Sequence, residues 1–195
     1  MKQIALFASG TGTNAEKIIE GSLPAAGAGE KDQPYKVALI VCNKPGAGVL
    51  KIAEENNIPT LLIEKEKFFR GNGYADELKA AGIDLIVLAG FLWKIPAVLI
   101  KVFPKKIINI HPALLPKYGG KGMYGHYVHE AVIAAKEKES GITIHYVDEL
   151  YDHGQIILQA KCMVSENDTP ETLAKKVQAL EHRHFPGVVT MLSTL

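Results

Sequence analysis

The sequence has little cysteine, almost no net charge and no long hydrophobic run, and each of these scarcities excludes a class of protein. Its only two cysteines, Cys42 and Cys162, lie within apolar runs, which favours buried thiols over a disulfide framework and makes a reducing, cytoplasmic compartment the expectation. The formal net charge is +1, so composition predicts no nucleic-acid or membrane partner. No segment approaches the ~18 uninterrupted apolar residues of a membrane-spanning helix. The 195 residues fit one globular domain.

Apolar runs of strand length alternate with amphipathic stretches of helix length. The predicted strands are Ile4–Ala8, Val37–Val41, Thr60–Ile63, Leu85–Ala89, Ile107–Ile110, Ile142–Val147 and Ile156–Val164. The predicted helices are Asn14–Glu20, Ala47–Asn56, Tyr74–Ala81, Pro96–Phe103, Tyr124–Lys138 and Pro170–Thr194, the last expected to break at Pro186. Strands that are apolar on both faces and separated by helices predict a Rossmann-like α/β fold, with an open, mostly parallel sheet covered on both sides. Only a short loop, Asp148 to Gln155, joins the last two strands, so these should pair antiparallel.

The segment KIINIHPALLPKY, Lys106 to Tyr118, is the first candidate for chemistry. It reads as a short buried strand with two polar residues at its end, Asn109 and His111, before the chain is stiffened by Pro112. Residues two apart on a strand share a face, so the amide and the imidazole should lie side by side. Such a pair could hold a polarised carbonyl and transfer a proton, although a structural cap remains the alternative.

A glycine-rich loop, Ser9 to Asn14, follows the first predicted strand and precedes a helix. Free N–H groups at a helix start attract an anion, and phosphates commonly bind at this turn of a doubly wound sheet. The spacing matches neither G-x-G-x-x-G nor G-x-x-x-x-G-K-[ST], so the loop predicts a phosphate monoester rather than a dinucleotide or a nucleoside triphosphate. A turn without a ligand is the alternative.

The acidic loop before the last predicted strand contains Asp148, Glu149 and Asp152. A solvated loop is the ordinary interpretation of such a run. If the loop folds back, however, a carboxylate could orient His111 and favour the imidazolium. Asp152 is the candidate, because Gly154 just beyond it would permit the inward turn.

Other polar and aromatic residues allow more than one interpretation. His145 is predicted to be a hydrogen-bonded sheet histidine rather than a catalyst. A glycine-rich stretch from Gly119 is predicted to form a flexible flap beside His111, and His126 and His129 on the helix after it lack a third partner for a metal site. Trp93 either lines a pocket at the carboxyl end of a strand or packs against the next helix.

Taken together, these motifs resemble one family, the glycinamide ribonucleotide formyltransferases of purine biosynthesis. The similarity covers nearly the whole chain: SGTGTN, LIVLAGF, NIHPALLPKY, YDHGQIILQAK and the pair Glu181-His182. The specific signature is NIHPALLPKY followed about forty residues later by D-x-G and ILQAK.

The resemblance implies that the formyl group of 10-formyltetrahydrofolate passes to the primary amine of 5-phosphoribosylglycinamide. By the same resemblance, Asn109 and His111 stabilise the oxyanion, and Asp152 holds His111 in its charged form and assists proton transfer. It also implies a cis bond at Leu115-Pro116.

The resemblance further implies the binding residues. Gly12, Thr13, Asn14 and Glu181 match the positions that bind the ribonucleotide, and Arg70, Leu92, Trp93, Lys94, Ile95 and Asn109 match those that bind folate. Trp93 stands where many relatives have arginine. The co-substrate 10-formyltetrahydrofolate and small-molecule partners are implied, and no metal is required. Residues 1–100 would form a phosphate-binding half and residues 101–195 a catalytic and folate half.

Three alternatives stay open. A formyltetrahydrofolate deformylase and a formyltransferase acting on methionyl-tRNA have a similar core, but each carries a further domain for which this sequence has no room. The third alternative is a non-catalytic protein that binds a phosphate ligand through the glycine loop, with His111 only structural. The sequence does not predict the oligomeric state.

Overall fold

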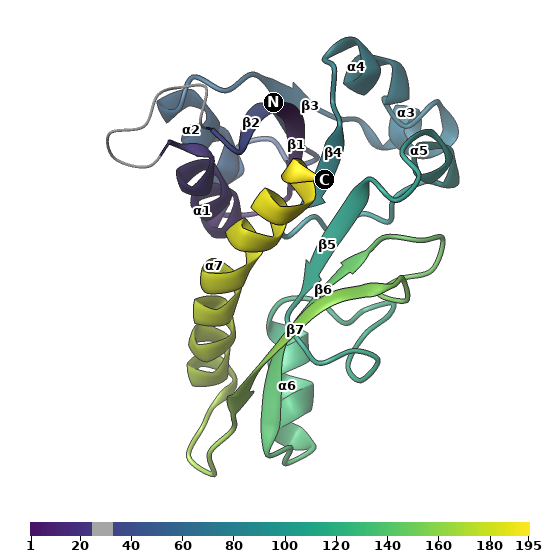
Figure 1. Ribbon diagram of the computed structural model, residues 1–195. Coiled ribbons are helices and arrows are strands. Elements are labelled where there is room, and N and C mark those ends of the chain that lie inside the picture. Colours follow the sequence, from purple (N-terminus) through teal and green to yellow (C-terminus); the bar gives the residue numbers. More distant parts are fainter. Residues whose placement is uncertain (25–32) are drawn as a thin grey trace.

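The computed structural model describes residues 1–24 and 33–195. The low-complexity stretch Pro24 to Gln33, whose composition predicts a surface loop, lies mostly outside the described residues. A seven-stranded sheet crosses the molecule in the order β3-β2-β1-β4-β5-β6-β7 (Figure 1). The strands are β1 (Lys2–Ala8), β2 (Tyr35–Cys42), β3 (Thr60–Leu62), β4 (Leu85–Leu88), β5 (Ile107–His111), β6 (Glu139–Tyr146) and β7 (Ile156–Met163).

The pairing confirms the predicted mixed sheet. Strands β1 to β5 pair parallel to one another, whereas β6 pairs antiparallel with both β5 and β7. The register places Asn109 of β5 directly opposite His145 of β6. This cross-strand pair lies at the end of β5 where the polar residues were predicted.

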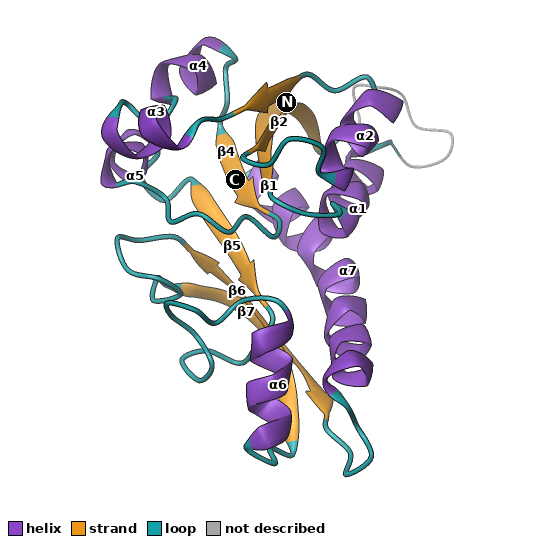
Figure 2. Ribbon diagram, turned by 180° about the vertical axis from the view of Figure 1, so that it is seen from behind, coloured by secondary structure: helices purple, strands orange, loops and turns teal. Residues whose placement is uncertain are grey.

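The helices cover both faces of the sheet (Figure 2). They are α1 (Thr13–Ser22), α2 (Gly48–Glu55), α3 (Lys65–Arg70), α4 (Ala75–Ala80), α5 (Ala97–Val102), α6 (His126–Ala134) and α7 (Pro170–Thr194). Apolar residues of α1, α2, α6 and α7 enter one core cluster, and those of α3, α4 and α5 enter the other. None of the helices in residues 1–24 and 33–195 is both long and apolar enough to cross a membrane.

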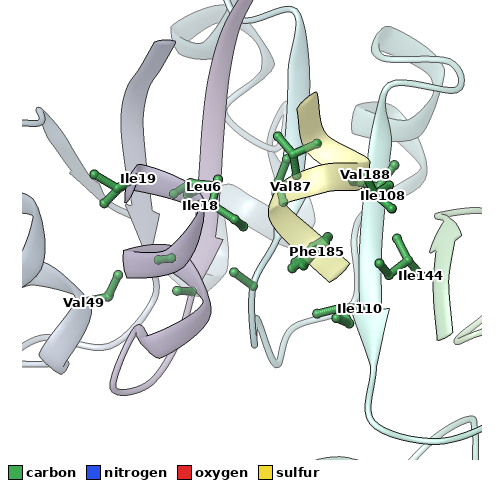
Figure 3. Packing of buried hydrophobic residues seen from close by; sticks show 14 of the residues in the cluster. Leu6, Ile18, Ile19, Val49, Val87, Ile108, Ile110, Ile144, Phe185 and Val188 are labelled. Atoms are coloured by element: carbon green, nitrogen blue, oxygen red, sulfur yellow. The ribbon is translucent and has the colours of Figure 1, made fainter. Parts of the chain in front are cut away.

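Alternation along β1 shows how the sequence builds these two cores. Leu6 packs into the cluster on the side of α1 and α7, and its neighbour Phe7 packs into the opposite cluster. The first cluster contains Leu6, Val87 and Ile108 from the sheet and Phe185 from α7 (Figure 3). Burying each such side chain contributes about 1.5–3 kcal/mol, which is why apolar runs on both faces predicted a covered sheet.

The predicted break at Pro186 was wrong, because α7 is continuous from Pro170 to Thr194. Proline removes a backbone hydrogen bond, but Phe185, Val188 and Val189 are buried around it and hold the helix against the sheet. A Cβ on Gly21 of α1 would lie 3.0 Å from Cβ of Pro186, so the two helices pack closely at this point. Tertiary packing therefore outweighs the local preference.

The β6–β7 pair gives a direct test of the packing. A Cβ on Gly141 would lie 1.9 Å from the carbonyl oxygen of Ala160 in β7, so Gly141→Ala must separate the two strands. We expect it to lower the free energy of unfolding by about 3 kcal/mol, the upper end of the usual overpacking range. Gly187→Ala is the matched control, because no atom lies within 4 Å of the added methyl and α7 should gain helix propensity. Urea unfolding of both variants measures the difference, and equal midpoints would contradict the packing.

Candidate active site

One cavity of about 790 Å³ opens at the carboxyl ends of the central parallel strands. Its lining takes Ser9 and Gly10 after β1, the segment 90–95 after β4, and 109–112 at the end of β5. Residues 120–126 and the loop 147–152 provide the remaining walls, together with one face of α7. Open α/β sheets bind ligands at this edge, and the volume is in the usual range for a small-molecule site.

The end of β5 presents Asn109 and His111 to this cavity. They alternate with Ile108 and Ile110, which pack into the core, so both polar side chains fall on the other face, as predicted. His111 is only 3% exposed. The side chains are brought together by Asp152, whose Oδ1 lies 3.4 Å from Asn109 Nδ2 and whose Oδ2 lies 3.5 Å from His111 Nδ1.

Backbone geometry turns Asp152 inward. Asp152 itself adopts a left-handed conformation with φ +52°, and the N–H of Gly120 donates a 2.9 Å hydrogen bond to its Oδ2. Asp152 therefore reaches His111, the arrangement that the sequence left conditional on the loop folding back. Gly154 is required for close approach, because a Cβ there would lie 1.8 Å from the carbonyl oxygen of Tyr146.

Burial and neighbouring charges act on the pKa of both members of the His111–Asp152 pair. Burial lowers the pKa of His111 below its ordinary value, and the opposing effects of the Asp152 charge and the Tyr118 carbonyl do not compensate for it. Burial thus opposes the charged form of His111 that the resemblance implies, and Asp152 favours that form. Burial alone would raise the pKa of Asp152, but His145, the charge on His111 and the Gly120 N–H together lower it. Asp152 is the charged member of the pair at neutral pH.

His145 lines the cavity, although the sequence predicted a hydrogen-bonded sheet histidine rather than a catalyst. Its Nδ1 lies 2.8 Å from the carbonyl oxygen of Tyr146, so Nδ1 carries the hydrogen, and its Nε2 accepts from Asn109 Nδ2 at 3.2 Å. It is satisfied, as predicted, yet it lines the cavity and orients the Asn109 amide. The signal that could have identified it was the β5–β6 register, which the sequence alone does not provide.

The glycine loop and α7 form one end of the cavity. No side chain caps the N-terminus of α1, so its first N–H groups have no partner within the helix. Asn14 and Glu181 line the cavity and are joined by a 2.8 Å hydrogen bond, and burial raises the pKa of Glu181 despite that bond. Gly12 and Thr13 belong to the same loop but do not line the cavity.

Two further residues at this end of the cavity were not predicted from the sequence. Lys175 and Gln178 line the cavity and precede Glu181 at intervals of three along α7, so the three side chains share one helix face. Gln178 Nε2 donates to Thr13 Oγ1 at 3.3 Å, which ties α7 to the glycine loop. Their helical spacing from Glu181 was the available signal.

The predicted folate wall, Leu92 to Ile95, lines the other end of the cavity. Trp93 lines the cavity, which is one of its two alternatives. It also packs on Phe68 and Phe69, with ring centroids 5.6 and 5.4 Å away, but these belong to the earlier helix α3 and not to the helix after Trp93. Lys94 Nζ lies 5.7 Å from the ring centroid of Tyr151 in the opposite wall. These contacts make the wall largely apolar with one cation.

Other candidates lie outside this constellation. Arg70, at the end of the unpredicted helix α3, is exposed, pairs with Glu66 and does not line the cavity. His126 and His129 both line the cavity, where His126 is exposed and pairs with Glu130 on its own helix and His129 is buried. Over the described part of the chain, no three histidine, cysteine or acidic residues gather as metal ligands would. The expected cis bond at Leu115-Pro116 is present.

The chain is similar to known proteins over almost its whole length. A phosphoribosylglycinamide formyltransferase of Bacillus subtilis is 36% identical over 98% of this chain and 95% of its own length. A chloroplastic protein of that name from Arabidopsis thaliana is 44% identical over 96% of this chain, which spans 64% of that relative, and it spans 61% of the relative from Vigna unguiculata. The crystal structure of phosphoribosylglycinamide formyltransferase from Bacillus halodurans superposes with a TM-score of 0.84 at 38% identity, covering 98% of this chain and 95% of that one.

The family model described as formyl transferase matches residues 2–189. The Bacillus halodurans structure agrees with the seven-stranded, mostly parallel sheet. The chain belongs to the formyl transferase family.

Proposed function

We propose that the protein transfers the formyl group of 10-formyltetrahydrofolate to the primary amine of 5-phosphoribosylglycinamide. The observation that supports this most is the convergence of Asn109, His111 and Asp152 in one cavity that has an apolar wall at one end and a glycine loop at the other. The relatives' names supply the acceptor. Both cysteines are unpaired, which suits the reducing cytoplasm we infer for it.

In the proposed reaction the amine nitrogen attacks the formyl carbon, and the carbonyl electron pair moves to oxygen. Asn109 Nδ2 makes two contacts, one of 3.2 Å with His145 Nε2 and a longer one of 3.4 Å with Asp152 Oδ1. The hydrogen that makes the longer contact would be donated to the oxyanion. The intermediate collapses when the bond from carbon to the folate nitrogen breaks. His111 and Asp152 carry the proton lost by the amine toward that leaving nitrogen, which becomes N–H.

The two substrates would occupy opposite ends of the cavity. We assign the phosphate to the free N–H groups of the loop Gly12 to Asn14 and the sugar hydroxyls to Glu181. The pterin and its tail would lie along Leu92 to Ile95, beside Asn109. In this proposal residues 1–100 would form the phosphate-binding half and residues 101–195 the catalytic and folate half, with Leu92 to Ile95 of the first half extending the folate wall.

The proposal is tested with purified protein, 10-formyl-dideazafolate as donor and synthetic glycinamide ribonucleotide as acceptor. Absorbance follows deformylation of the donor. We expect a signal that requires the acceptor. Donor consumption without acceptor would instead indicate a deformylase, and acceptor binding without consumption would indicate a non-catalytic phosphate-ligand protein.

Glu181→Ala should weaken the ribonucleotide end selectively. The change removes the acceptor of the Asn14 hydrogen bond and the carboxylate proposed to hold the sugar hydroxyls. We expect the KM for the ribonucleotide to rise about 10- to 100-fold, as for loss of a hydrogen bond to a charged group, while the KM for the folate donor stays unchanged. Glu20→Ala, an exposed acidic residue of α1 paired with Lys17, is the control. Equal increases in both KM values would contradict the assignment.

A further inference from the structure

A second, smaller cavity of about 180 Å³ lies beside the chain segment that follows His111. Its lining includes Lys117, Tyr118, Glu137 and Ser140, none of which lines the large cavity. Tyr118 connects the two regions. Its backbone carbonyl lies 2.7 Å from His111 Nε2, and its side chain lines the small cavity.

The backbone conformation of Tyr118 must be stabilised by contacts with other residues. Its φ is +56°, the left-handed region that is unfavourable for a residue with a Cβ. The Tyr118 hydroxyl donates a 2.9 Å hydrogen bond to Glu137 Oε1, and Lys117 Nζ lies 2.9 Å from the same oxygen. The Lys117 contact, followed by the Tyr118 bond, lowers the pKa of Glu137, so the acceptor is a charged carboxylate. This charge-assisted bond is available to hold the strained residue in place.

The backbone carbonyl of Tyr118 determines which nitrogen of His111 carries a hydrogen. A carbonyl oxygen only accepts, so Nε2 of His111 must be the donor and the neutral ring is the Nε2–H tautomer. Nδ1 is then left with a lone pair that faces Asp152 Oδ2 across 3.5 Å. In this tautomer Nδ1 can accept a proton in the reaction, whereas in the other tautomer it already carries one.

We propose that Tyr118 is a positioning residue for His111, and that its hydrogen bond to Glu137 holds the backbone carbonyl that fixes the Nε2–H tautomer. The inference rests on the proposed function only for its effect on turnover. The tautomer itself is a property of the unliganded protein. Asp152, His145 and His129 also face His111 from the neighbouring loop, β6 and α6, and the variants below leave all three in place.

Tyr118→Phe removes the hydroxyl and keeps the ring. We expect Tyr118 to relax from the left-handed conformation and its carbonyl to move from Nε2. Nitrogen-15 NMR of the histidine rings should show His111 shifting toward the Nδ1–H tautomer, and kcat should fall about 10- to 100-fold with both KM values unchanged, as for a small misplacement of a reacting group. The pH at which His111 becomes protonated should also fall, because the Tyr118 carbonyl raises its pKa.

Variants of the acceptor separate this role from a general loss of structure. Glu137→Ala should reproduce both effects, and the double variant should be no worse than either single one. Glu137→Gln keeps an acceptor oxygen and should restore most of the turnover, and Lys117→Ala should change little because it leaves the carboxylate in place. A wild-type His111 tautomer in Tyr118→Phe, or independent losses in the double variant, would overturn the proposal. Failure of the proposed function would appear instead as an inactive wild-type protein, with the NMR result unaffected.

Discussion

We expect Asn109→Ala to lower kcat by about 10²- to 10³-fold with little change in the KM for either substrate. In the proposed mechanism the amide donates to the developing oxyanion, and such donors act mainly in the transition state. His145 holds the amide in place through its 3.2 Å contact, so the alanine variant loses a preorganised donor rather than a mobile one. Steady-state kinetics with both substrates saturating measures the change.

Asn56→Ala is the matched control for this prediction. Asn56 also contributes an amide, but it is exposed at the end of α2, where it donates to the carbonyl of Ile52. It should retain full turnover. A kcat within about threefold of wild type for Asn109→Ala would remove the amide from the mechanism, since a missing oxyanion donor costs far more than that.

We expect Asp152→Asn to lower kcat more, by about 10³- to 10⁴-fold, as when a catalytic histidine loses its carboxylate partner. The negative charge is the largest influence that opposes the effect of burial on His111, so its loss lowers the pKa of His111 further. The new amide must also present its oxygen to the Gly120 N–H, which leaves its NH₂ group toward Asn109, itself a donor. Proton transfer and the orientation of Asn109 are then both impaired.

The pKa of Asp152 also predicts how activity changes with pH. Because the folded environment lowers the pKa of Asp152, the carboxylate stays charged to below the ordinary range of aspartate, and activity that depends on it is lost only as the pH falls through that lowered value. Glu149→Gln is the control, since Glu149 is exposed in the same loop and does not line the cavity. Equal turnover in Asp152→Asn and Glu149→Gln would exclude Asp152 from catalysis.

Much of the fold could be predicted because its strands are apolar on both faces, a pattern that few other architectures require. Helix α3 was missed because it has six residues and only Phe68 is buried, too few for a periodic signal. Helix α6 begins at His126 rather than Tyr124, after a segment in which Gly120, Gly122 and Gly125 have positive φ. Short-range patterns therefore identified the long elements and the mixed, mostly parallel sheet, and they failed where an element was short or its backbone conformation was unusual.

In the candidate site, too, residues marked by a local sequence pattern were predicted, and those that depend on long-range contacts were not. Asn109 and His111 could be found from their spacing on one strand, which is a local property. His145 needed the register of β5 against β6, and the protonation preference of His111 needed its burial, neither of which is local. Arg70 was assigned from the resemblance alone, and it lies on an exposed helix end away from the cavity.

The most direct test of formyl transfer follows the carbon itself. The donor is prepared with carbon-13 in the formyl group and incubated with the protein and glycinamide ribonucleotide, and carbon-13 NMR then locates the label. We expect the label to appear as a formamide on the acceptor amine. Both Asn109→Ala and Asp152→Asn should reduce the rate at which it appears. Label released as free formate, at the same rate with or without the acceptor, would contradict this expectation.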